Sequence, residues 1–235
     1  LSLFYEELEY PEDIIKEILK AQLPDGGFAI YHDTADVDIT AMALQALAPY
    51  ANSFQSFTYT QQAINTTVTK TVRTVVEEAL ATLSTMQTKS GDFTSWGEPN
   101  AESTAQVLVA LSALQIDPLT DTRFIKNGQT ILDGLMHYQQ EDGGFIHSEN
   151  YNPENPTSLP DESNSMASEQ VLYSLIAYKR ATENFRALYD IRAEQNNGLK
   201  QQIEQLEQAI LSADLTKRQR VTELIEMYSA IPVDE

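Results

Sequence analysis

The chain has 235 residues, 42% hydrophobic and 21% charged, enough for one sizeable core or a domain with an appendage. Its 35 acidic and 15 basic residues give a net charge of −20, which excludes the basic face of a duplex nucleic-acid binder and disfavours anionic membrane surfaces. No apolar run approaches the roughly 20 residues of a membrane-spanning helix. Cysteine is absent, which excludes disulfides, thiolate metal sites and thioesters.

Apolar residues recur at helical spacing in three stretches, and a second stretch rich in Ala and Leu follows each of them. The first stretches cover 12–22, 72–86 and, more loosely, 124–138. The second stretches begin near Asp38, Glu102 and Ser165, residue types that suit a helix cap or first turn. Because the second helices are apolar on most faces, we expect an all-α fold in which they lie inside.

A Gln-x3-Gly-x-Phe motif lies between the two helices of each predicted pair and marks an internal repeat. We expect each Gln to bond the turn backbone, each Gly to adopt a left-handed conformation and each Phe to pack between neighbouring units. Thr40, Thr104 and Ser168 align at intervals of 64 residues in the second helices, where Gln106 and Gln170 share a column with Met42. The motif residues are Gln22, Gly26 and Phe28; Gln87, Gly91 and Phe93; and Gln139, Gly143 and Phe145.

On these residues the chain resembles the prenyltransferase and squalene-cyclase repeat superfamily, in which such motifs recur in an (α/α)6 toroid. The stretches 36–49, 102–106, 124–128 and 166–170 are similar to a branch found in exported proteins of Gram-positive bacteria. The resemblance covers about residues 9–180. It implies a partial toroid of three helical hairpins, with the other half supplied by upstream sequence or another chain. It also implies an extracellular or cell-wall location, and the start at Leu1 suggests a processed protein or a fragment.

The composition changes after Arg180, where a polar segment rich in Gln and Glu begins. A short heptad seam and a second apolar stripe predict a helical hairpin. We therefore divide the chain into a toroid half at 1–182 and a helical hairpin or stalk at 183–235, which alternatively packs back onto the toroid. The seam is formed by Leu199, Ile203, Leu206 and Ile210, and the stripe by Val221, Leu224, Ile225 and Tyr228.

Asp36 and Asp38 are the sharpest candidates for chemistry. They resemble the first two acidic positions of the DxDDT motif of class II terpene cyclases, with Asp38 in the place of the proton-donating acid. Ile39 stands where that motif has its third carboxylate. The alternative, which we favour, is that Asp38 caps the inner helix and Asp36 interacts with its positive end. Glu102, in the equivalent column, supports capping because it lacks the cyclase motif.

Another activity found on this fold, protein prenyl transfer, needs a residue type that this chain lacks. Protein prenyltransferases bind zinc through Asp, Cys and His, and this chain has no Cys. His32 and His147 follow two of the Gly-Phe turns, and we expect neither to bind a metal. We expect no cofactor. The stretches 51–69 and 148–164 are predicted as long connections, the first able to line the toroid mouth.

The sequence thus favours a non-catalytic toroid module of a secreted or surface protein that binds a ligand or protein partner. One alternative is a terpene-cyclase-like or prenyltransferase-like enzyme with Asp38 as general acid, assisted by Asp36. A second is half of a cobalamin-carrier-type protein. The candidate binding residues are Asp36, Asp38, Glu102, Trp96, His32 and His147.

Overall fold

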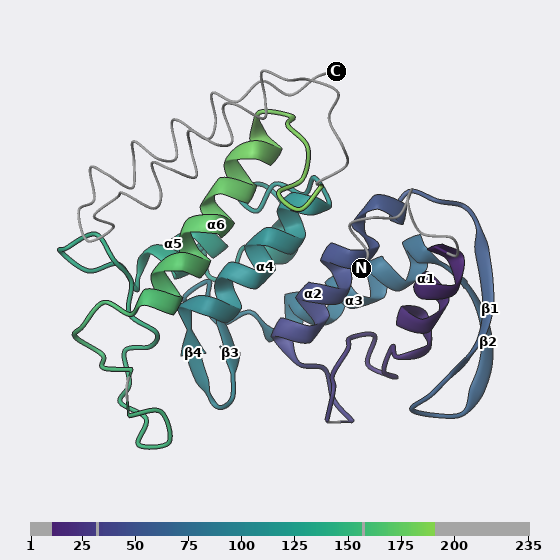
Figure 1. The fold of residues 1–235 in the computed structure, drawn as a ribbon, viewed down its shortest axis with the longest axis horizontal. Coiled ribbons are helices and arrows are strands. Elements are labelled where there is room, and N and C mark those ends of the chain that lie inside the picture. The colour runs from purple at the N-terminus through teal and green to yellow at the C-terminus, as the bar shows by residue number, and fades with distance from the viewer. Residues whose placement is uncertain (1–10, 32, 157, 191–235) are drawn as a thin grey trace.

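The computed structural model describes residues 11–31, 33–156 and 158–190, and it is mostly helical (Figure 1). The predicted helical hairpin at 183–235 is wrong at its start, because residues 183–190 form turns and irregular chain rather than helix. From residue 191 onward it lies outside the described residues, as does His32. The α-helices are α1 (Pro11–Lys20), α2 (Val37–Leu47), α3 (Val72–Met86), α4 (Ala101–Ala113), α5 (Ile131–Met136) and α6 (Ser165–Thr182). Short 3-10 turns, η2 and η3, span Ala48–Tyr50 and Thr122–Phe124.

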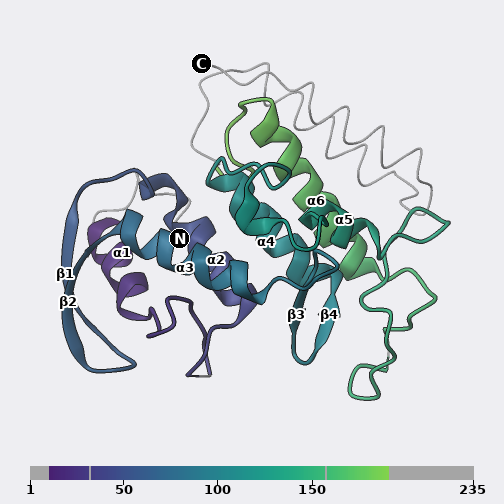
Figure 2. The same ribbon diagram turned by 180° about the vertical axis from the view of Figure 1, so that it is seen from behind.

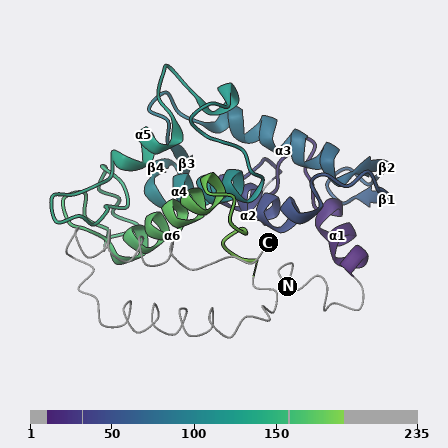
Figure 3. The ribbon, with the colours of Figure 1, turned by 90° about the horizontal axis from the view of Figure 1, so that it is seen from above.

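Helix α4 is the centre of the arrangement. It contacts α2 on one side and α6 on the other, whereas α3 packs on α2 and α5 packs on α4. The row α2, α4, α6 runs side by side in Figure 1, and the view from above in Figure 3 places α3 and α5 along one side of this row. We call α2, α4 and α6 the central helices. All residues of α4 from Ala101 to Ser112 are buried, as expected for a helix covered on all sides.

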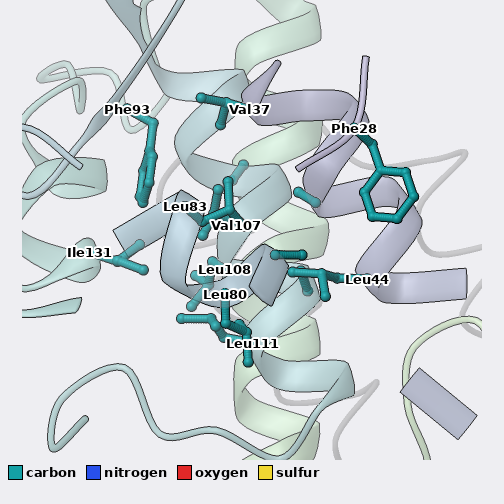
Figure 4. Packing of buried hydrophobic residues seen from close by; sticks show 14 of the residues in the cluster. Phe28, Val37, Leu44, Leu80, Leu83, Phe93, Val107, Leu108, Leu111 and Ile131 are labelled. Carbon is teal, nitrogen blue, oxygen red and sulfur yellow. The ribbon is translucent and has the colours of Figure 1, made fainter. Parts of the chain in front are cut away.

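The apolar core lies between the central helices and the helices that cover them (Figure 4). Leu44 and Leu108, which share a column of the repeat, are both fully buried. From α3, Leu80 and Leu83 are also fully buried. Full burial of such a side chain contributes about 1.5–3 kcal/mol relative to exposure, so these residues stabilise the packing of α2 against α3 and α4.

Two antiparallel strand pairs interrupt the helices, and they differ from the predicted all-α fold. β1 (Ser56–Gln61) pairs with β2 (Thr66–Thr71), and β3 (Phe93–Ser95) pairs with β4 (Glu98–Asn100). The first pair occupies most of the stretch predicted as a connection. Phe57 and Tyr59 are buried while the alternate residues Thr58 and Thr60 are exposed, the two-residue period of a strand. Figure 2 shows this pair at the edge of the molecule, beside α1.

We call the three Gln-x3-Gly-x-Phe turns, at 22–28, 87–93 and 139–145, the corners. A hydroxyl near the start of each central helix accepts a hydrogen bond from the corner that precedes it. Phe28 N donates to Thr40 Oγ1 at 2.9 Å, and Phe93 N donates to Thr104 Oγ1 at 3.1 Å. At the third corner Phe145 N donates to the Ser168 hydroxyl at 2.9 Å. The aligned column of Thr and Ser therefore joins each corner to its central helix by a hydrogen bond.

The motif glutamines and glycines shape the corners themselves. Gln22 Nε2 donates to Gly26 O and Gln87 Nε2 donates to Gly91 O, each at 2.9 Å. At the third corner, the backbones of Gln139 and Phe145 form an antiparallel bridge. The corner glycines Gly26, Gly91 and Gly143 have φ of 94°, 93° and 91°, a region in which residues with a side chain are strained.

Candidate functional site

Each central helix begins with a side-chain cap, and the caps recur at the 64-residue interval of the repeat. Asp36 accepts from Ile39 N at 2.9 Å, Asn100 accepts from Ser103 N at 2.8 Å, and Asn164 accepts from Met166 N and Ala167 N. The prediction that Asp38 caps α2 is therefore wrong. Because α2 begins at Val37, Asp38 lies within the first helical turn and Asp36 takes the capping position.

The second residue of each central helix occupies one column, filled by Asp38, Glu102 and Met166. All three line a single cavity of about 460 Å³ where the central helices begin. The β3–β4 hairpin and the loop that follows the third corner supply much of its wall. The other lining residues are Met42, Ser95, Trp96, Glu98, Asn100, Ser103, Gln106, His147, Asn152, Glu154, Asn155 and Gln170.

Glu102 is a buried carboxylate with only one of its oxygens engaged. The residue is 8% exposed, and its Oε2 lies 2.7 Å from His147 Nδ1. That contact raises the pKa of His147 above its ordinary value of 6.5, against the opposing effect of burial. The other oxygen, Oε1, is buried without a hydrogen-bond partner. An unpaired buried acceptor is costly in free energy.

Asp38 presents a second oxygen of the same kind, because its Oδ1 is also buried without a hydrogen-bond partner. Burial raises the pKa of Asp38 above its ordinary value of 3.8, and the charges of Asp36 and Glu102 add to the shift. The neighbouring hydroxyls of Ser103 and Ser95 act in the opposite direction and lower this pKa in part. The carboxyl group therefore retains its proton to a higher pH than an exposed aspartate does.

Asp36, by contrast, has partners for both of its oxygens. Its Oδ1 caps α2, and the Ser95 hydroxyl donates to its Oδ2 at 3.2 Å. Of the two aspartates, only Asp38 lines the cavity.

Trp96, the single tryptophan of the chain, lies at the rim of the cavity. It occupies the tight turn between β3 and β4 with φ of 55°, followed by Gly97 with φ of 89°. A bulky residue is rarely found in this left-handed region. The turn leaves Trp96 82% exposed, so its ring is accessible to a molecule entering the cavity.

A row of amides crosses the central helices beside the carboxylates. Gln45 Nε2 donates to Gln106 Oε1 at 3.1 Å, and Gln106 Nε2 donates to Gln170 Oε1 at 3.1 Å and also to Tyr173 Oη. The repeat column of Gln106 and Gln170 is therefore polar, and it forms part of the cavity wall.

Sequence reasoning missed several lining residues. Ser95 and Ser103 were not singled out. The caps Asn100 and Asn164 were also missed, although they align with Asp36 at the 64-residue interval of the repeat. The loop residues Asn152, Glu154 and Asn155 belong to the stretch predicted only as a long connection. Their approach to the cavity depends on how the loop packs, which no local pattern indicates.

Two other features bear on what the described residues can bind. Within the described ranges, no group of three or more His, Cys, Asp or Glu residues is arranged to hold a metal ion. A second, apolar cavity of about 390 Å³ lies farther along the central helices, next to the segment that follows α6. Its walls include Met42, Ala46, Pro49, Val109, Ala113, Ala177, Ala181, Leu188 and Tyr189.

None of the described helices is both long and apolar enough to cross a bilayer.

Comparison with known proteins identifies the family. Searches of curated proteins and of solved structures give no match. The family model of the prenyltransferase alpha-alpha toroid domain matches residues 2–75 and 57–157, which together cover more than half of the chain. The chain therefore belongs to the prenyltransferase alpha-alpha toroid family.

Proposed function

We propose that the chain is a non-catalytic toroid module that binds a ligand in the cavity where the central helices begin. The observation that carries this proposal is the pair of buried, unpartnered oxygens, Asp38 Oδ1 and Glu102 Oε1, on two residues that line one cavity. Buried polar groups in folded proteins are nearly always hydrogen-bonded. Two acceptors without donors beside an open cavity are therefore consistent with a partner that arrives from solution.

The lining of the cavity favours binding of a polar molecule over cyclisation of a hydrocarbon. Cyclisation of a terpene needs a dry, aromatic wall around the reacting chain. Here most of the lining residues carry a carboxylate, an amide or a hydroxyl, and the only tryptophan is mostly exposed. Ile39 replaces the third carboxylate of the cyclase motif.

The second candidate function, acid catalysis by Asp38, rests on a different observation. A general acid must hold its proton near the working pH, and burial raises the pKa of Asp38. The two proposals differ in what Asp38→Asn should do. If Asp38 is an acid, the variant loses all turnover of a polyprenyl or terpenoid-epoxide substrate and still binds it, as judged by mass spectrometry of products and by calorimetry.

We further propose that the three hairpins form half of a toroid and that a second half comes from elsewhere in a longer protein or from another chain. The family assignment and the apolar cavity along the central helices support this arrangement. By resemblance to exported Gram-positive proteins, such a module would lie outside the cell or at the cell wall.

A thermal-shift screen with a blocked cavity tests the binding proposal. Met166 lines the cavity and is 51% exposed, so Met166→Trp should fill the entrance without disturbing the core. Met136 is 40% exposed on α5 and is not among the lining residues, so Met136→Trp is a matched control. We expect some class of small polar compound to raise the Tm of the parent and the control but not that of Met166→Trp. No shift in the parent, or equal shifts in all three proteins, would contradict the proposal.

A further inference from the structure

The chemistry of the two unpartnered oxygens restricts what the cavity accepts. An ionised carboxylate is an acceptor only, so each oxygen needs a donor from its partner. Glu102 is more than nine-tenths buried, and its free oxygen belongs to a residue that lines the cavity. Asp38, one repeat earlier, lines the same cavity and carries a second buried acceptor without a donor. A ligand rich in acceptors, such as a carboxylate or phosphate, would leave both oxygens unpaired.

The charges around the cavity point in the same direction. Four lining residues carry carboxylates, namely Asp38, Glu98, Glu102 and Glu154. Among the described residues, no lysine or arginine lines the cavity, and the one basic group, His147, is paired with Glu102. The positive ends of the central helices offset part of this charge, each by about half an elementary charge. The remaining field favours a cation and repels an anion.

We propose that the cavity binds an organic cation with N–H donors, of the primary alkylammonium class, and this inference rests on the proposed ligand-binding function. The ammonium group donates to Glu102 Oε1 and Asp38 Oδ1. The chain that carries it runs past Trp96 at the rim. Ammonium groups are attracted to the face of an indole ring, and charge-assisted hydrogen bonds to carboxylates are stronger than those between neutral groups.

Two features of the wall support this assignment independently of the charge. Trp96 is held exposed at the rim by a left-handed backbone, a strained arrangement of the kind that clusters at functional sites. Met42 and Met166 give the cavity apolar sides, and thioether side chains adapt to flexible alkyl chains. A cavity with acceptors in its wall, apolar sides and an aromatic rim matches the sequence of groups along an alkylammonium ion.

Trp96 provides a direct readout, because no other tryptophan contributes to the fluorescence of the chain. The full chain is titrated at low ionic strength with three probes of equal carbon number. These probes are 1,5-diaminopentane, 1,5-pentanediol and glutarate, a dication, a neutral diol and a dianion. We expect saturable quenching by the diamine and none by the other two.

Variants then locate the binding. Glu102→Gln and Asp38→Asn remove one charge each with little change in shape, and each should weaken diamine binding by about tenfold or more, which corresponds to about 1.4 kcal/mol. Glu141→Gln is the control, because Glu141 is exposed and is not among the lining residues. It should leave the affinity within about twofold of the parent, as expected for the loss of a distant, screened charge.

The outcomes separate this inference from the proposed function. Saturable binding of glutarate or pentanediol but not of the diamine would overturn the inference while leaving a ligand-binding cavity. Equal weakening by Glu141→Gln and Glu102→Gln would also overturn it, because the diamine would then respond to overall charge. If none of the probes alters the fluorescence, the inference fails. If the thermal-shift screen also finds no compound, the proposed function fails with it.

Discussion

The corners and the cavity are built from the same repeat, yet they use it differently. At the corners both the residue and its partner recur: a Phe amide donates to a Thr or Ser hydroxyl in all three units. In the cavity the backbone position recurs but the residue changes, from Asp38 to Glu102 to Met166. Two of these three side chains have a buried oxygen without a partner.

This contrast separates the residues that stabilise the fold from the residues that are available to bind a ligand. A group that repeats with its partner stabilises the joint between a corner and the central helix that follows it. A position that varies between units while remaining at one cavity is available for a ligand. Substitutions at the corners and in the cavity, made one at a time, test this division.

The largest effect is expected at the second corner. In Gly91→Ala the new Cβ would lie 2.1 Å from Thr130 O, and the residue would be strained at φ of 93°. We expect a loss of about 3 kcal/mol or more in the free energy of unfolding, measured by denaturant titration. Gly97→Ala is the matched control, because Gly97 has φ of 89° with open space around it. A similar loss in both variants would mean that strain alone, and not the close packing of the corner, decides.

A smaller loss is expected from Thr104→Val, which keeps the shape of the side chain and removes its hydroxyl. Phe93 N would lose its acceptor and Asn100 O its donor. Leaving buried groups unpaired costs about 1–3 kcal/mol. Thr58→Val, on the exposed face of β1, removes a hydroxyl that bonds only Thr69 Oγ1 among the described contacts and should cost much less. Chemical unfolding of both variants measures the difference.

A substitution in the cavity is expected to increase the stability of the protein, whereas the corner substitutions decrease it. Asp38 has a raised pKa, so its contribution to stability is fully present below its ordinary value of 3.8 and is lost as the pH rises through the folded-state value. Asp38→Asn should therefore be the more stable protein at neutral pH, with a higher Tm in thermal unfolding. The advantage should shrink as the pH falls toward 4. An Asp38→Asn variant with a lower Tm at neutral pH would mean that Asp38 stabilises the fold.

The smallest change is expected at His147. Its pKa is raised by Glu102, so the stability it contributes is complete below 6.5 and is lost as the pH rises through the folded-state value. In NMR titrations, Glu102→Gln should lower the pKa of His147. An unchanged His147 would mean that the pair does not form in solution.

The sequence was most informative about the corners. The positive φ of Gly26, Gly91 and Gly143 and the extents of α1 and α3 followed from local patterns, because glycine punctuation and helical periodicity act over short distances. The start of α2 was misplaced by two residues, since Asp36 and Asp38 are both suitable caps. The β1–β2 pair was taken for a connection even though Phe57 and Tyr59 alternate with threonines.

The cavity was much less predictable. Asp38, Glu102, Trp96 and His147 were named as candidates, but nothing in the sequence indicates that Glu102 bonds His147 across 45 residues. The orphaned oxygens are a property of three-dimensional packing, in which a loop and a strand pair cover the helix ends. Local patterns cannot give such a result because the residues involved come from separate repeats.

The most direct test of the central claim is the position of a bound probe. Crystals of the full chain soaked in 1,5-diaminopentane should show density for an ammonium group within hydrogen-bonding distance, about 3 Å, of Glu102 Oε1 or Asp38 Oδ1. Density confined to the apolar cavity beside Val109 and Ala177, or an empty cavity at the helix starts, would contradict the account.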